Sequence, residues 1–199
     1  VASVQKKFGL KMPVAIDTTG KLAKAFNLIA TPYHVLLDRD SNIVYAKYIE
    51  PKDLDETIKL VGDGRALSVV PALAEAGTVS AIKLSGMADK PSALFFLATW
   101  CDWYLKDSRP SLSKSCAASQ EQVNKLVTRY PKVQWHGVVT RLWTEEKDVA
   151  EYRKKFNVKH SLAIDNDNSV FLANGVRDVP TLILFDKGKE VFRTQQIDL

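Results

Sequence analysis

The sequence predicts an α/β fold with a central mixed sheet flanked by helices, and part of that arrangement occurs a second time. Residues 93–97 are all apolar, which is typical of a strand buried on both faces. Pro180 is followed by Thr181 and the four apolar residues 182–185. Proline donates no hydrogen bond to a sheet, so it must start that strand or lie on an edge. Sliding the chain by 148 positions superposes residues 4–46 on 152–194 without a gap.

Composition indicates a globular chain with a real core. The chain has 199 residues, of which 46% are hydrophobic. Its 28 basic residues exceed its 23 acidic residues but form no block, which favours a solvated surface over a nucleic-acid interface. No apolar run approaches the roughly 18 residues that a membrane-spanning helix needs. The segment after Val1 lacks the pattern of a signal peptide. The sequence leaves open whether an export signal preceded Val1 and was removed.

The repeat places similar residues at the boundaries of elements. The matched pairs are Phe8 and Phe156, Asp17 and Asp165, Ala25 and Ala173, Pro32 and Pro180, Leu36 and Leu184, and Asp38 and Asp186. Identical residues are few over the two segments as a whole, but they fall where a helix, strand or turn begins or ends. The two segments therefore look like the same half-domain.

Each copy is predicted to hold a helix end, a short strand, a helical turn, a proline turn and two strands. In the first copy these are a helix ending near Phe8, strand 14–17, helix 20–26, the turn Thr31-Pro32-Tyr33, and strands 34–38 and 43–48. In the second copy they are helix 144–156, strand 162–165, helix 169–173, the turn before Pro180, and strands 182–186 and 190–194.

The other elements follow from the same signals. A helix is predicted at 51–61, with proline at its start and acidic residues in its first turn. The remaining predictions are helix 67–76, strand 78–84, strand 93–97, a helical stretch from Cys101 to Tyr130, and the buried strand 133–139.

Two segments resemble the thioredoxin family. The turn and strand at 175–185 resemble its proline loop, and the strand ending in Trp100-Cys101 resembles the strand that leads to its redox cysteine. Residues 98–101 read Ala-Thr-Trp-Cys, which is similar to the AxWC sequence of the TlpA/ResA group.

This resemblance implies a thioredoxin-like fold and a thiol-disulfide oxidoreductase that acts on protein thiols or disulfides. Cys101 would be the thiolate nucleophile. The peptide bond between Val179 and Pro180 would be cis and would face that cysteine, and the backbone of Val179 would bind an extended substrate peptide. No metal or other cofactor is expected, and the group points to an exported, periplasmic or other extracytoplasmic protein.

The residues around Cys101 both fit and depart from this pattern. A thiol at a strand end and in a first helical turn meets unpaired backbone N–H groups, which stabilise its thiolate. A thioredoxin also has a second cysteine three positions later, because one helical turn brings the two sulfurs together. Here that position is Tyr104. Phe95 stands where thioredoxins carry a buried acid, and Asp102 adds a negative charge that opposes thiolate formation.

The only other thiol is Cys116, and two interpretations of it stay open. A straight helix over 101–116 would separate the cysteines by about 22 Å, far beyond the ~7 Å limit for a disulfide. Residues 107–111, however, form a signal for a break and a restart at Pro110. A loop at 102–109 would let Cys116 fold back and pair with Cys101, as a redox or structural disulfide. Otherwise Cys116 is a buried, inert thiol.

Three aromatic residues lie close to Cys101 in the sequence. Trp100, Trp103 and Tyr104 are predicted to form an aromatic patch that grips an apolar peptide, with core packing as the alternative for Trp100. A peroxiredoxin is disfavoured because Leu94 and Ala98 occupy the positions of its Pro and Thr.

A metal site is disfavoured as well, because His34, His136 and His160 show no ligand spacing. Two functions remain. The first is thiol-disulfide exchange through Cys101, and the second is a non-catalytic thioredoxin-like module that binds peptides or serves as a scaffold.

The repeat also predicts the domain organisation. Residues 1–62 are expected to be the C-terminal half of a first thioredoxin-like domain, and residues 63–199 a second such domain that lacks its last helix. A half-domain alone exposes a sheet face and an edge. The first segment is therefore expected to pack on the second domain, to lend it a helix, or to complete a partner chain in a homodimer.

Overall fold

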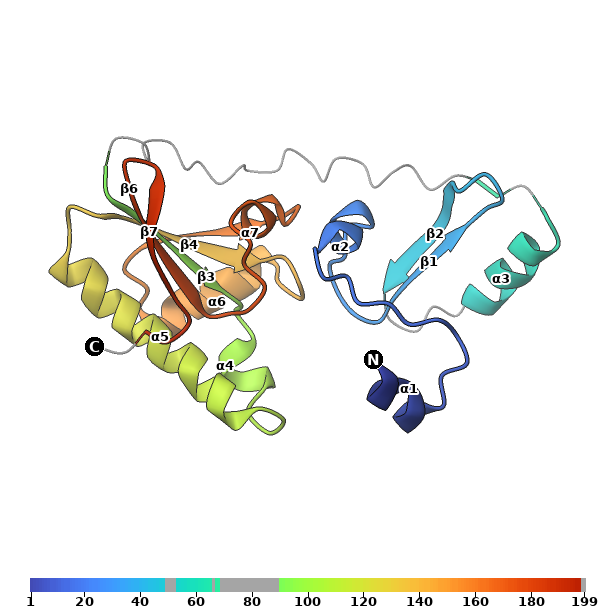
Figure 1. Ribbon diagram of the computed structural model, residues 1–199, viewed down its shortest axis with the longest axis horizontal. Helices are drawn as coiled ribbons and strands as arrows, with labels where there is room; N and C mark the ends of the chain where they lie inside the picture. The colour runs from blue at the N-terminus through green and yellow to red at the C-terminus, as the bar shows by residue number, and fades with distance from the viewer. Residues whose placement is uncertain (49–52, 66, 69–89, 198–199) are drawn as a thin grey trace.

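The computed structural model describes residues 1–48, 53–65, 67–68 and 90–197, in two units (Figure 1). The first unit, residues 1–65, contains α1 (Ala2–Phe8), α2 (Lys21–Ala25), β1 (Tyr33–Leu37), β2 (Ile43–Tyr48) and α3 (Leu54–Gly62). The second unit, residues 90–197, contains β3 (Ser92–Leu97), α4 (Cys101–Tyr104), α5 (Pro110–Arg129), β4 (Gln134–Thr140), α6 (Glu146–Phe156), β5 (Ser161–Asp165), α7 (Ser169–Ala173), β6 (Thr181–Asp186) and β7 (Lys189–Thr194).

The second unit is built on a mixed sheet in the order β5-β4-β3-β6-β7. Strands β5, β4 and β3 are parallel, and β6 and β7 are each antiparallel to their neighbour. The predicted central mixed sheet is confirmed. Because β6 lies between two strands, Pro180 stands at the start of its strand and not on an edge.

Side chains of β3 are buried on both sides of this sheet, which explains its unbroken apolar run. Phe95 packs on one face with Val123 of α5 and Val149 of α6. Phe96 packs on the other face with Phe171 of α7, at 5.0 Å between ring centroids. Successive side chains of a strand point to opposite faces, so helices cover both sides.

Gly137 of β4 marks a close approach inside this core. A Cβ built at this position would overlap the Leu162 side chain and would lie 2.8 Å from His160 Cε1. We expect Gly137→Ala to lower the free energy of unfolding by about 2 kcal/mol through overpacking, measured by urea denaturation. Gly62→Ala is the matched control, because no atom lies within 4 Å of its built Cβ. Equal effects of the two substitutions would contradict this account.

Several local backbone features of the first unit recur in the second at the same offset of 148 positions. Asp17 accepts a hydrogen bond from the N–H of Ala23, and Asp165 accepts one from the N–H of Phe171. The peptide bonds before Pro32 and Pro180 are both cis. Three pairs of equivalent residues have positive φ, namely Gly9 and Asn157, Gly20 and Asn168, and Asn27 and Gly175. Corresponding local structure therefore occurs in both units.

Most predicted elements are confirmed, and one is wrong. Residues 14–17 form no strand in the described part of the chain, whereas the equivalent β5 pairs with β4. A strand needs a neighbour that satisfies its backbone groups, and the sheet described in the first unit holds only β1 and β2. Helix 67–76 and strand 78–84 were predicted for a region outside the described residues, apart from residues 67 and 68.

The two units meet where α2 faces α7 (Figure 1). The N–H of Trp143 donates to the carbonyl of Ile29 at 2.8 Å, and Lys24 Nζ lies 3.4 Å from Asp167 Oδ2. Helix α3 contacts β1 of its own unit. The contact between the units therefore comes from the segment that precedes β1, not from α3.

Candidate redox site

Cys101 lies where β3 gives way to α4. Its N–H donates to the carbonyl of Ala98 at 3.3 Å, and the residue is fully buried. Apolar β3 places Cys101 at the carboxyl end of the central strand, as the sequence predicts. The chain then turns at once into α4, whose first residue is the cysteine.

A disulfide joins Cys101 to Cys116, with 6.0 Å between the two Cα atoms. Helix α4 ends at Tyr104, and α5 starts at Pro110, so the predicted break separates two helices. Proline fits the first position of a helix because its missing N–H would have no partner there. Cys116 lies in the second turn of α5. The straight helix that would have kept the sulfurs apart does not form.

The disulfide is enclosed by the turn that carries it and by the proline loop. Ala98 and the two cysteines form a buried cluster, against which Trp100, Leu105, Leu112 and Val179 pack. Ser113 Oγ donates to the carbonyl of Asp102 at 2.6 Å and so ties α5 to α4. Only 7% of Cys116 is exposed.

The proline loop lies against this cluster through Val179. Val179 contacts it directly, and the bond that follows is cis. A cleft of about 430 Å³ runs beside Val179 and Trp100 and is closed on its far side by residues 16–20 of the first unit. The structure thus brings together the cysteines and the loop that the sequence singled out.

The three aromatic residues differ in exposure. Trp103 and Tyr104 are 59% and 52% exposed, whereas Trp100 is half-buried and donates from Nε1 to the carbonyl of Leu142 at 2.7 Å. Trp143 completes the group, with its ring centroid 5.7 Å from that of Trp100 and 5.2 Å from that of Tyr104. We define these four residues as the aromatic cluster.

Sequence patterns alone missed Trp143. It follows β4 and has a φ of 50°, which is uncommon for a residue other than glycine. A signal did exist, because the residues after parallel strands gather at one edge of a sheet. The loop after β4 therefore had to lie near Cys101, at the end of β3.

Comparisons with known proteins agree with this geometry. No protein-family model matches the chain. The chain is 30% identical over 115 residues to the thiol-disulfide oxidoreductase ResA of Bacillus thuringiensis, and equally to that of Bacillus cereus. Each alignment covers 56% of this chain and 58% of the relative, so the chain spans less than two thirds of these relatives' length. Over these residues the chain is similar to thiol-disulfide oxidoreductases of the ResA type.

Solved structures similar to this chain include a secreted Mycobacterium tuberculosis disulfide oxidoreductase homologous to Escherichia coli DsbE. It has a TM-score of 0.43 and 18% identity, over 54% of this chain and 69% of that one. StoA from Bacillus subtilis has a TM-score of 0.42 and 16% identity, over 53% and 73%. The thioredoxin domain of a Bacteroides vulgatus thiol-disulfide oxidoreductase has a TM-score of 0.46 and 14% identity, over 83% and 85%.

The charges beside the disulfide are paired across two helices. Lys155 Nζ of α6 forms an ion pair and hydrogen bond with Asp102 Oδ2, and only 7% of the Asp102 side chain is exposed. Burial, together with the charge of Asp102, raises the pKa of the Tyr152 hydroxyl far above its ordinary value. The sequence did not indicate Lys155, which lies on a helix far along the chain. Its charge offsets that of Asp102 beside the cysteine.

The second unit also differs in its interior from the pattern that the resemblance implies. Phe95 is 1% exposed and meets the ring of His160 edge-on, at 6.1 Å between ring centroids. Burial lowers the pKa of His160 to about 4. Two apolar or neutral groups thus fill the region where the resemblance implies an acid.

Two features are absent from the residues that the structure describes. Within them, no group of three His, Cys, Asp or Glu side chains is arranged to hold a metal ion. None of the helices in the described ranges is both long and apolar enough to cross a membrane.

Proposed function

We propose that the protein exchanges thiols and disulfides through Cys101 and Cys116. The single observation that carries this proposal is the disulfide between them, formed at the carboxyl end of β3 and in contact with Val179. The similarity to ResA supports the same chemistry. The substrate would be a protein thiol or disulfide bound along the Val179–Pro180 loop, with Trp100, Trp103 and Tyr104 beside it.

In the reducing direction, the Cys101 thiolate attacks one sulfur of a substrate disulfide. A mixed disulfide forms, and the substrate's other sulfur leaves as a thiolate. The Cys116 thiolate then attacks Cys101 Sγ, which releases the second substrate thiolate and forms the Cys101–Cys116 bond. The substrate gains the two electrons that the two cysteines lose. Each step reverses in the oxidising direction.

Cys101 is the proposed nucleophile because of its surroundings. It is the first residue of α4, and the N-terminal end of a helix favours the charge of a thiolate. The ion pair of Lys155 with Asp102 offsets the negative charge next to it. Cys116 lies inside the twenty-residue helix α5, past its first turn, and is the proposed resolving thiol.

Single-cysteine variants test this assignment. Reduced Cys116→Ser, mixed with oxidised glutathione, is expected to form one stable adduct on Cys101, because no second thiol can displace it. Reduced Cys101→Ser is expected to react at least about tenfold more slowly, since its remaining thiol lacks the activated position. Intact-protein mass spectrometry over time gives both rates.

The wild-type protein controls for resolution, since its adduct should be transient and end as the Cys101–Cys116 disulfide. Faster reaction at Cys116 than at Cys101 would overturn the assignment. Failure of both folded variants to react would instead favour a second candidate, a non-catalytic module that binds peptides. That candidate is supported by burial of both cysteines, of which Cys101 is 0% exposed and Cys116 7%.

We propose further that residues 1–62 are the C-terminal half of a first thioredoxin-like domain and that residues 63–199 belong to a second. The backbone features repeated at an offset of 148 positions support this organisation. A homodimer in which a partner chain completes the first unit is compatible with it. By analogy with the secreted relative, we propose export from the cytoplasm.

A further inference from the structure

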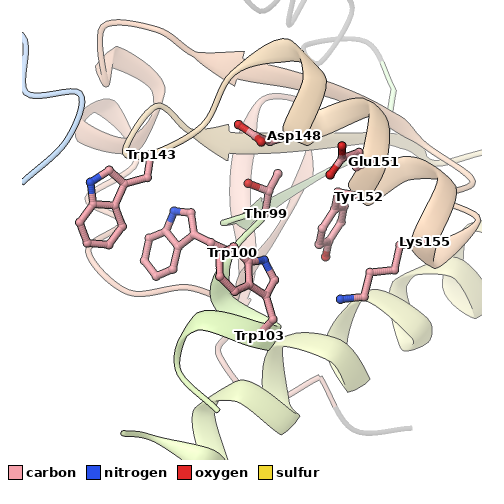
Figure 2. Close-up of a pocket in the computed structure, with 8 residues that line it drawn as sticks. All are labelled: Thr99, Trp100, Trp103, Trp143, Asp148, Glu151, Tyr152 and Lys155. Atoms are coloured by element: carbon pink, nitrogen blue, oxygen red, sulfur yellow. The ribbon is translucent and has the colours of Figure 1, made fainter. Parts of the chain in front are cut away.

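A second cleft, of about 350 Å³, opens between α4 and α6. Figure 2 shows its lining. One wall carries Trp100, Trp103 and Trp143, and the other is one face of α6. This cleft is distinct from the one beside Val179, because none of its lining comes from the proline loop or from the first unit.

The face of α6 in this cleft carries an unbalanced negative charge. Asp148, Glu151, Tyr152 and Lys155 follow the spacing of successive helical turns and so point the same way. Lys155 is engaged by Asp102. Glu151 forms no ion pair with any described residue, and Asp148 accepts only the N–H of Glu145 at 2.7 Å. Neither carboxylate forms an ion pair with a described residue, and the nearest charge of the same helix that acts on both is that of Lys147.

A buried acceptor without a partner lies behind Lys155, on a residue that does not itself line the cleft. Asp102 meets Lys155 through Oδ2, while Oδ1 is buried and has no hydrogen-bond partner among the described residues. A buried acceptor left without a donor is costly. The carboxylates of Asp102, Asp148 and Glu151 therefore outnumber the ammonium group of Lys155 in and behind this cleft.

The opposite wall is suited to a cation as well. Trp103 is 59% exposed, and the Trp100 and Trp143 rings meet at 66°, edge toward face. The face of an indole ring attracts a cation, and it does so more strongly than the face of tyrosine or phenylalanine. Aromatic faces opposite free carboxylates suit a group that is both planar and positively charged.

We infer that this cleft binds the guanidinium group of an arginine side chain on an extended peptide or protein segment. A guanidinium can stack on indole while its N–H groups donate to a carboxylate such as that of Glu151, which an ammonium does less well. If the proposed redox function holds, the cleft would favour substrates that carry arginine near their cysteine. Binding of the arginine itself requires no redox step.

Two short capped peptides without cysteine test this inference on the oxidised protein. They differ only at a central residue, arginine in one and its uncharged analogue citrulline in the other. We expect the arginine peptide to bind about tenfold more tightly, followed by tryptophan fluorescence and calorimetry, because citrulline loses the ion pair and the cation–π contact. Glu151→Gln is expected to lower the ratio of the two peptide affinities by a factor of at least about three.

Glu146→Gln is the matched control, since Glu146 is an exposed acid on the same helix that does not line the cleft. Asp148 is less suitable for substitution because it also caps α6. Equal affinity for the two peptides would overturn the inference, as would equal effects of Glu151→Gln and Glu146→Gln. Because the peptides lack cysteine, a failed thiol-exchange assay leaves this result unaffected.

Discussion

Reduction of the Cys101–Cys116 disulfide is expected to lower the free energy of unfolding by about 3 kcal/mol. The bond closes a loop between residues 15 positions apart. The unfolded chain regains the entropy of that loop when the bond is broken, whereas the folded chain is held by its other contacts. Urea denaturation monitored by tryptophan fluorescence, with and without dithiothreitol, measures the difference.

The double variant Cys101→Ser/Cys116→Ser serves as the control, because dithiothreitol has no bond to break in it. Its stability should match that of the reduced wild-type protein and should not respond to reductant. A wild-type difference below about 1 kcal/mol would show that the disulfide contributes little to the fold. The main role of the bond would then be in redox exchange and not in stability.

Acid is expected to destabilise the protein through His160. Burial lowers the pKa of this residue from 6.5 to about 4, so the folded state holds it neutral. Its Nδ1–H donates to the carbonyl of Ser161 at 2.9 Å, and Nε2 lies 3.2 Å from Gln120 Nε2, as an acceptor. Protonation would place two donors against each other at Nε2.

The sign of the pH effect follows from these pKa values. Above about pH 6.5 the ring is neutral in both states and its contribution is complete. As the pH falls, the unfolded state takes up the proton first, so stability is lost. By about pH 4 the loss from His160 reaches about 3 kcal/mol. Urea denaturation of the oxidised protein at about pH 7.5 and about pH 4 measures the total change.

His160→Gln isolates this contribution, because glutamine keeps hydrogen-bonding groups but does not titrate. The variant should lose about 3 kcal/mol less than the wild-type protein over the same pH interval. Other groups, such as His136, whose pKa burial also lowers, and Asp165, whose pKa burial raises, are common to both proteins and cancel in the comparison. Identical pH profiles would exclude His160 as the source.

Local sequence signals predicted most of the fold. The apolar run of β3 and the residues around Pro180 reflect burial and backbone restrictions that act within a few positions. Strand 14–17 failed because its status depends on a partner strand. The disulfide was left open because it depends on one loop, and Pro110 could only indicate that the helix breaks there.

Trp143 and Lys155 were missed for a related reason. Each reaches the site from an element far along the chain, so only the topology of the sheet and the packing of α6 bring them near Cys101. The family resemblance could not supply them either.

The three pairs of positive-φ positions have a consequence for how the two units are compared. In every pair one unit uses glycine and the other asparagine. These are the residues that reach the left-handed region at least cost, so either one preserves the bend of the chain. Counting identities treats each pair as a mismatch. Comparing the sign of φ treats each pair as a match. A common origin of such segments is then sought in the shape of the backbone, which is kept after the residue identities have changed.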